Sequence, residues 1–329
     1  MAESDLSPDV AAPAALAASL RRSATSFGKF ARALFSRPSS AVGATIVLFF
    51  LVLALFGPLI APHAENDQNN PPRQPPGVAY PFGTDYLGRD VFSRVILGTR
   101  SIFFTAGVGT LIAVVIGTFL GLFMGYRGGW IDEITGRFID AFLALPALLI
   151  ALVILGVVRN VDFEPGSWQS AIANQSVLIV IALVYVPIVA RVVRSSTLDI
   201  KTREFVQAAQ IRGESQFYIL FREIFPSVVP ALVVEASLRF SYAIFLVASL
   251  GFLGVGASPP TPDWGLMVNE NRGGLYQLAP WALNYPALAI AVLVIGVNLM
   301  SDGIKRVVQK RECVSSLPSL VESRAASCA

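Results

Sequence analysis

The chain has 329 residues, of which 54% are hydrophobic and only 14% are charged. An ordinary soluble domain carries about 25% charged residues, because polar groups must cover its surface. The mean hydropathy of +0.63 agrees with this. The composition therefore excludes a soluble globular protein and indicates an integral membrane protein. The net charge of +3 is too small to indicate nucleic-acid binding as a main task.

The sequence offers little for catalysis or metal binding. Cys313 and Cys328 are the only cysteines, too few for a disulfide framework or a zinc site. His63 is the only histidine, and we interpret it as a solvated loop residue. The sequence contains no Cys/His or Ser/His pairing, no HExxH motif and no Walker-type glycine loop. We therefore predict no catalytic residue, no metal, no cofactor and no nucleic-acid partner.

Six apolar segments are long enough to cross a bilayer, which takes about 20 residues for roughly 30 Å of hydrocarbon. Inside a bilayer the backbone must satisfy its own hydrogen bonds, so these segments predict an all-α, polytopic fold. The predicted spans cover residues 41–61, 102–126, 139–158, 177–193, 228–250 and 285–307.

The basic residues predict the orientation. If the N-terminus is cytoplasmic, 18 of the 25 Lys and Arg residues lie in inside stretches and six lie outside. Both termini are therefore expected in the cytoplasm. We divide the chain into an N-terminal tail (1–40), a first span with an extracytoplasmic loop (41–100), a transmembrane core (101–308) and a C-terminal tail (309–329). Because the first apolar run has full membrane length and begins far into the chain, we expect no cleavable signal.

Several residues inside the predicted spans bear on helix packing. Gly117, Gly121 and Gly125 follow at four-residue intervals, which lets another helix approach one face closely. That helix is either a moving partner or an ordinary bundle neighbour. Pro146 and Pro187 are expected to kink or loosen the third and fourth spans.

The fifth span contains two charges, Glu235 and Arg239, four residues apart. A charge in hydrocarbon costs about 2.5–3.5 kcal/mol even on lenient scales, so the two are expected to pair along one helix face. Two interpretations stay open. The pair either lines a solute pathway or is a structural intrahelical pair near the inner interface.

The two long outer loops carry different signals. Residues 91–98 have apolar side chains at helical spacing behind Asp90, a good N-cap, which predicts a short helix at the outer interface. Trp264 and Trp281 belong to the third outer loop and suit a water–lipid boundary.

The second inside loop gives the strongest signal. We predict a helix that ends near Ile211, a turn at Gly213, and a second amphipathic helix ended by Pro226. One side of this second helix carries Phe217, Leu220, Phe221 and Ile224, and an exposed apolar stripe in a cytoplasmic loop should dock on a partner. Ala208 and Ala209 are small enough to permit a close approach.

Two motifs carry a resemblance to a known family. The pattern Gln207-Ala208-Ala209, then Gly213, then Ile224-Phe225-Pro226 resembles the EAA loop of permease subunits of bacterial ABC importers. The outer segment 81–100 resembles that of the "C" subunits in the dipeptide/oligopeptide/nickel branch; its motif residues are Gly83, Thr84, Asp85, Gly88, Arg89, Asp90, Arg94 and Arg100. Segments 251–256, 259–265, 280–281 and 298–303 extend the resemblance over residues 41–308.

The resemblance implies a type I importer permease fold in a bacterial cytoplasmic membrane. The expected partners are the lipid bilayer, a second homologous permease subunit, two cytoplasmic ABC ATPases that hydrolyse ATP, and an extracytoplasmic binding protein that delivers a peptide. It further implies an ATPase-coupling loop and an outer-mouth motif formed by the residues given above. The coupling residues are Glu204, Gln207, Ala208, Ala209, Gly213, Phe217, Leu220 and Phe221.

The sequence also departs from the family pattern. Gln207 stands where the family usually has glutamate, so Glu204 becomes the candidate for a charge contact with the ATPase. Val247 stands where the branch often has an acidic residue. The solute stays open among peptides, glutathione, nickel chelates and opines. A self-sufficient secondary transporter is the rival class, but it would require coupling-ion ligands at the midplane or an inverted repeat, and the sequence shows neither clearly.

Overall fold

The computed structural model describes residues 32–161, 164 and 166–315. In this part of the chain the regular structure is helical, apart from an isolated antiparallel bridge between Thr84 and Asp90. Five helices are long and apolar enough to cross a membrane, and a bent helix pair, taken together, is the sixth candidate span. This confirms the all-α fold with six spans. Most of the predicted N-terminal tail, and residues 316–329 with Cys328, lie outside the described residues.

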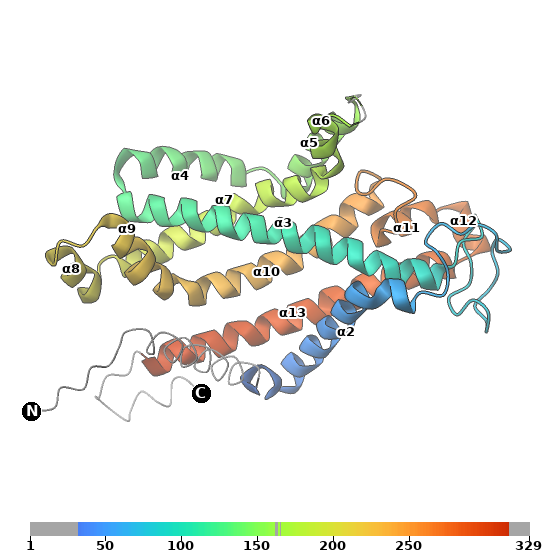
Figure 1. Ribbon diagram of the computed structural model, residues 1–329, viewed down its shortest axis with the longest axis horizontal. Helices are drawn as coiled ribbons and strands as arrows, with labels where there is room; N and C mark the ends of the chain where they lie inside the picture. Colours follow the sequence, from blue (N-terminus) through green and yellow to red (C-terminus); the bar gives the residue numbers. More distant parts are fainter. Residues whose placement is uncertain (1–31, 162–163, 165, 316–329) are drawn as a thin grey trace, which may run out of the picture.

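The spans form an elongated bundle with short helices at both ends (Figure 1). The spans are α2 (Pro38–Ile60), α3 (Val91–Arg127), the bent pair α4 (Gly129–Leu143) and α5 (Ala147–Arg159), α7 (Ser176–Ile200), α10 (Phe225–Phe252) and α13 (Trp281–Ser315). The remaining elements are α6 (Trp168–Asn174), α8 (Glu204–Ile211), α9 (Gln216–Tyr218), the π-helical turn η1 (Ile219–Ile224), α11 (Trp264–Glu270) and α12 (Gly274–Leu278). We call the end that holds α8 and α9 the α8 end, and the opposite end, with α11, α12 and residues 61–90, the loop end.

Helices α3 and α7 pack in direct backbone contact, as the glycine spacing predicts. A Cβ atom added to Gly117 would lie 2.7 Å from Cβ of Val189, and one added to Gly121 would lie 2.5 Å from the carbonyl oxygen of Ala190. Gly125 meets α7 in the same way, at the next turn. Side chains larger than hydrogen have no room here, so the glycines hold α3 and α7 side by side and parallel.

Residues 91–98 are not a separate interfacial helix. Asp90 caps a helix there, as predicted, by accepting hydrogen bonds from the backbone of Phe92 (3.1 Å) and Ser93 (3.3 Å). That helix is α3, which continues unbroken to Arg127. Its first turns are buried because other elements cover them: the Trp264 indole of α11 donates to the Val95 carbonyl at 2.8 Å.

The third span is broken where the sequence places Pro146. Helices α4 and α5 meet at an angle of 86°, so the predicted kink is confirmed. Pro187, by contrast, lies inside α7 without interrupting it. Helix α4 begins at the α8 end and runs back along α3 and α7 (Figure 1), and Ile139 is its one buried residue. Helix α4 is therefore held to the bundle by few apolar contacts.

Candidate functional site

The predicted loop between the fourth and fifth spans has the expected first half. Helix α8 ends at Ile211, and Gly213 follows with a φ angle of +76°, a conformation that favours glycine. The second half differs from the prediction. Pro226 does not end a helix, because residues 216–252 form one continuous helical stretch. Pro226 is the second residue of α10 and follows directly on the π-helical turn, so the helical stretch continues through it.

The apolar side chains of this loop separate into an exposed and a buried group. Phe217 is 77% exposed and Phe221 is 38% exposed, as predicted. Leu220 and Ile224 are buried, which corrects the assignment of both to the exposed stripe. The π-helical turn places them in a core shared by α3, α7, α8 and α10; this core contains Leu122, Val193, Val206, Ala209, Ile219, Leu220, Ile224 and Val228.

Two exposed apolar residues of α8 were missed by the sequence analysis. Phe205 is partly exposed and Ile211 is almost fully exposed. With Ala208 they lie three residues apart, a helical spacing that could have revealed them. We define the α8-end patch as Phe205, Ile211, Phe217 and Phe221.

The remaining coupling-loop candidates are divided between the surface and the core. Glu204, Gln207 and Ala208 are exposed, whereas Ala209 is fully buried. The Gln207 side chain donates to the Thr202 carbonyl at 3.1 Å. The residue in the family's glutamate position therefore connects α8 to the segment just before it.

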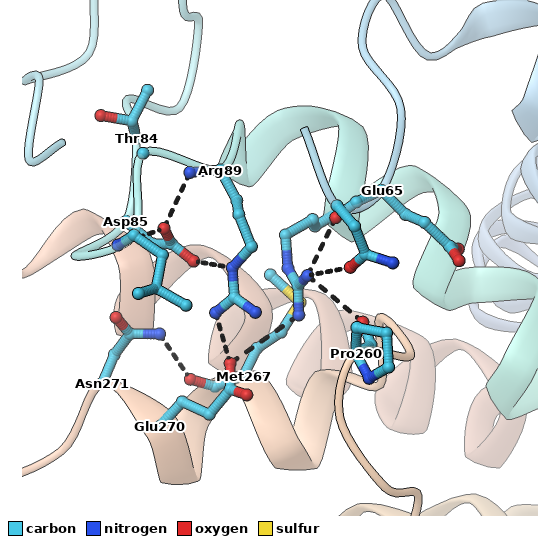
Figure 2. A network of polar contacts seen from close by, with 12 residues as sticks. Glu65, Thr84, Asp85, Arg89, Pro260, Met267, Glu270 and Asn271 are labelled. Atoms are coloured by element: carbon cyan, nitrogen blue, oxygen red, sulfur yellow. Dashed lines mark hydrogen bonds and ion pairs between the residues drawn. The ribbon is translucent and has the colours of Figure 1, made fainter. Parts of the chain in front are cut away.

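At the loop end, an ion-pair network joins the outer-motif segment to α11 (Figure 2). Arg89 Nε lies 2.5 Å from Asp85 Oδ2, and Arg89 Nη2 lies 2.6 Å from Glu270 Oε2. All three side chains are nearly buried. Burial opposes the charge of Arg89, but the attraction of Asp85 and Glu270 outweighs burial and raises the pKa of Arg89. Glu270 lies far away in the chain and was not predicted.

Arg94 approaches the same carboxylate from α3. Its Nη2 lies 3.8 Å from Glu270 Oε2, and its Nη1 donates to the Glu65 carbonyl at 2.9 Å. The side chain is 1% exposed. Arg100, the last residue of the predicted motif, is exposed and takes no part in the network. We call Asp85, Arg89, Arg94 and Glu270 the outer clamp.

Backbone geometry explains the glycines and the threonine of this motif. Gly83 and Gly88 have φ angles of +72° and +80°, which L side chains rarely adopt. The Thr84 hydroxyl donates to the Pro71 carbonyl at 2.7 Å, and the Trp281 indole donates to the Thr84 carbonyl at 2.9 Å. The motif is therefore folded into the loop end by its own contacts.

His63 is not a simple solvated residue. Its Nδ1 lies 3.0 Å from Asp90 Oδ2, and its backbone N–H donates to the Ser93 hydroxyl at 3.1 Å. His63 thus ties the end of the first span to the N-terminus of α3.

Glu235 and Arg239 form the ion pair that their spacing predicts. Arg239 Nε lies 2.7 Å from Glu235 Oε1, and both side chains are largely buried. The Arg239 guanidinium also lies over the rings of Tyr242 (5.0 Å to the centroid) and Tyr185 (5.9 Å). The contacts of the pair are therefore made within this chain.

A polar cavity of about 550 Å³ lies near the loop end, between α3, α5, α7 and α10. Val247 lines it, and so does Asp263, so the cavity keeps an acidic residue although valine occupies the family's acidic position. Asp263 is buried and caps α11 by accepting a hydrogen bond from the Leu266 backbone at 3.0 Å. Burial raises the pKa of Asp263 to about 6. Among the described residues, no three metal-ligating side chains gather at one point.

Comparison with known proteins gives matches over most of the chain. Residues 117–312 match the family described as "Binding-protein-dependent transport system inner membrane component". Residues 25–76 match the N-terminal transmembrane domain of oligopeptide transport permease C.

Curated relatives include a dipeptide transport system permease protein, DppC, of Alkalihalophilus pseudofirmus. It is 37% identical over 268 residues, which cover 80% of this chain and 83% of the relative. A glutathione transport system permease protein, GsiD, of Pectobacterium atrosepticum is 38% identical over 278 residues, covering 82% and 87%.

The fold is similar to a chain solved in inward-facing conformations of the MetNI methionine ABC transporter, with a TM-score of 0.51 at 18% identity. That likeness covers 65% of this chain and 96% of the other. The sequence matches point to the same family as the helical bundle and the loop between α7 and α10. The chain therefore belongs to the binding-protein-dependent transport system inner membrane components, and is the "C" permease subunit of a dipeptide/oligopeptide/nickel-type bacterial ABC importer of the inner membrane.

Proposed function

We propose that this permease translocates peptides delivered by an extracytoplasmic binding protein, together with a second homologous permease subunit and two cytoplasmic ABC ATPases. The names of the relatives support the solute class, because dipeptides and glutathione are both peptidic. ATP hydrolysis belongs to the ATPases, and this chain supplies the path and the coupling surface.

The proposed orientation places the α8 end in the cytoplasm and the loop end outside. The excess of Lys and Arg in the inside stretches supports it. The α8 end is then the part of the permease that cytoplasmic ATPases can reach.

The observation that carries the proposal is the α8-end patch. Its four apolar side chains would lie in water if the permease worked alone, and Phe217 is the most exposed of the three phenylalanines. We propose that the patch docks on an ATPase, with Glu204, Gln207 and Ala208 at its edge. The buried side of the loop shares one core with α3, α7 and α10. A displacement of the docked loop would therefore move these three spans, as alternating access requires.

The outer motif is proposed to shape the mouth of the permease. Asp85, Arg89 and Arg94 face α11 rather than lipid. This arrangement favours a rigid receiving surface for the binding protein over a lipid anchor.

Two matched variants test the coupling role. Phe217→Ser changes an exposed side chain, so the permease should fold and insert but lose co-purification with the ATPase and lose ATP-driven uptake. Leu220→Ser changes the shared core, so it should lower the thermal stability of the permease. Any loss of ATPase binding by this variant should follow from that lower stability. Normal uptake by Phe217→Ser, with the ATPase still bound, would remove the α8-end patch from the mechanism.

Mass spectrometry of the ligand that co-purifies with the binding protein tests the solute class. A peptide is expected, and a nickel chelate or an opine in its place would overturn the peptide proposal.

A further inference from the structure

The polar cavity between α3, α5, α7 and α10, which we call the loop-end cavity, is built for a polar ligand. Its volume of about 550 Å³ lies within the range of about 300–1,000 Å³ that is typical of small-molecule sites. Five hydroxyl side chains and one amide line it: Ser101, Thr105, Ser176, Ser258, Thr261 and Gln175. A groove between α5, α10, α11 and α13 differs, because its described lining is apolar except for Ser249. That groove suits lipid acyl chains, whereas the loop-end cavity suits a solute that forms hydrogen bonds.

Arg159, the last residue of α5, brings a positive charge to the loop-end cavity. Its Nη1 donates to the Gly254 carbonyl at 2.7 Å, and its Nη2 donates to the Gly256 carbonyl at 2.6 Å. A guanidinium has five N–H donors, so these two bonds leave three for a ligand. The two carbonyls are neutral. They therefore fix the position of the guanidinium without cancelling its charge.

Asp263 is the acidic residue among the described residues that line the cavity, but a solute cannot reach its charge. The residue is 2% exposed, and its carboxylate accepts a hydrogen bond from the Leu266 backbone at the start of α11. Arg159, by contrast, is exposed. The charge that a ligand can meet is thus positive. A guanidinium binds carboxylates best, through two parallel N–H···O bonds.

The first turn of α7 adds to the preference for negative charge. Ser176, Val177 and Leu178 begin this helix and line the cavity, and its N-cap residue Gln175 makes no side-chain cap hydrogen bond. The N-terminus of a long helix carries a partial positive charge on its N–H groups. The helix and the Arg159 side chain therefore act in the same direction within one cavity.

We propose that the loop-end cavity is a solute subsite of the permease, in which Arg159 holds the C-terminal carboxylate of a peptide. Phe104 of α3 is 58% exposed and lines the same cavity, so it offers an apolar surface to a peptide side chain. In the proposed orientation the cavity lies on the side from which a binding protein delivers the peptide. This inference rests on the proposed transport function and adds to it a binding site within this chain.

The position of the subsite gives it a route to the coupling loop. Helices α3, α7 and α10 line the cavity near the loop end, and the same three helices share a core with the loop at the α8 end. A peptide in the cavity therefore contacts the spans that a docked ATPase would displace.

Protection of a cysteine from modification tests the subsite. Cys313→Ser with Cys328→Ser removes the native thiols. Ser258→Cys then places a thiol of nearly the same shape in the cavity lining, and Gln277→Cys is an exposed control at the loop end outside that lining. The permease–ATPase complex is reconstituted without a binding protein in phosphatidylcholine nanodiscs. Dialanine should slow the reaction of Ser258→Cys with a water-soluble maleimide and leave the reaction of Gln277→Cys unchanged.

Dialanine amide, which has no carboxylate, tests the role of Arg159. Because the charge-assisted pair is lost, its half-protecting concentration should exceed that of dialanine by about tenfold or more. Arg159→Gln should bring the two concentrations within about twofold of each other, because glutamine can still donate to a loop carbonyl but carries no charge. The comparison of the two ligands with Arg159 intact decides the proposal even if the Arg159→Gln variant does not fold.

Four results would overturn the assignment. The first is equal protection by dialanine and its amide with Arg159 intact, and the second is no protection by either. The third is a slower reaction on addition of phosphatidylglycerol with no effect of dialanine, which would give the cavity to a lipid phosphate. The fourth is reaction of Ser258→Cys in the isolated permease but not in the complex, which would place the cavity in a subunit interface.

Peptide uptake by the complete transporter, with its binding protein, is measured separately. Uptake of dialanine without protection would overturn the subsite alone. Protection without uptake of any peptide would contradict the proposed transport function and leave the carboxylate site in place.

Discussion

Arg239 is held by neighbours of its own chain: the Glu235 carboxylate on the same helix and the rings of Tyr185 and Tyr242. Removal of one charge would leave the other uncompensated in an apolar setting. We therefore expect Glu235→Gln to reduce assembly or uptake more than the double change Glu235→Gln with Arg239→Gln does. The measurement is a double-mutant cycle on the yield of folded complex. Simple additivity would show that the two charges are not coupled.

Asp263 predicts a pH dependence of stability. Its folded pKa of about 6 lies above the ordinary value of 3.8, because burial disfavours the carboxylate. The protonated Asp263 therefore contributes roughly 3 kcal/mol to the free energy of unfolding. This contribution is fully present below about pH 4 and is lost as the pH rises through about 6.

Asp263→Asn tests this dependence, because asparagine keeps an oxygen for the cap of α11 and cannot ionise. The thermal midpoint of the purified permease, followed from pH 4 to 7, should fall more steeply for the wild type than for the variant. Parallel curves would assign the pH dependence to other groups.

At the scale of elements, the outer clamp fastens the segment before α3 to α11. Glu270 is 11% exposed and serves both Arg89 and Arg94. Glu270→Gln leaves two buried guanidiniums with less counter-charge, so a loss of about 3–5 kcal/mol in the free energy of unfolding is expected. Glu133→Gln is the matched control, because its ion pair is exposed and is worth about 1 kcal/mol or less. Denaturation of both variants in detergent compares them, and equal losses would contradict a stabilising clamp.

The loop between α7 and α10 shows where periodicity succeeds and where it fails. Composition and spacing identify the first helix, the Gly213 turn and the exposed Phe217. They do not identify the direction of Leu220, because the π-helical turn changes the angle between successive side chains and no sequence signal marks that turn. Pro226 likewise is compatible with the end of a helix or with a place inside a longer helical stretch, and the structure has the second.

At the scale of the whole molecule, the remaining prediction is topology. In a background that carries Cys313→Ser and Cys328→Ser, Pro75→Cys and Gln277→Cys at the loop end should react with an impermeant maleimide added outside intact cells. Gln210→Cys, on exposed α8, should react only after permeabilisation. All three positions are exposed in the structure, so differences in labelling report the side of the membrane on which a position lies, not its burial. Outside labelling at position 210 would reverse the proposed orientation.

The sequence by itself determined the class of protein and the six spans. It also determined the cap at Asp90, the kink at Pro146 and the close helix packing at Gly117, Gly121 and Gly125. These features depend on composition, helical period and backbone preferences that act within a few residues. The family motifs were also readable, since they are local in the chain.

Only the tertiary structure decided which distant groups meet. Glu270 joins Arg89 across 181 residues, Trp264 covers the start of α3, and the charges of α4 find those of α7. Such pairs carry no periodic signal, because their spacing is set by the path of the chain between them. The fold also decided that the first turns of α3 are buried rather than interfacial, since burial depends on which elements arrive to cover a surface.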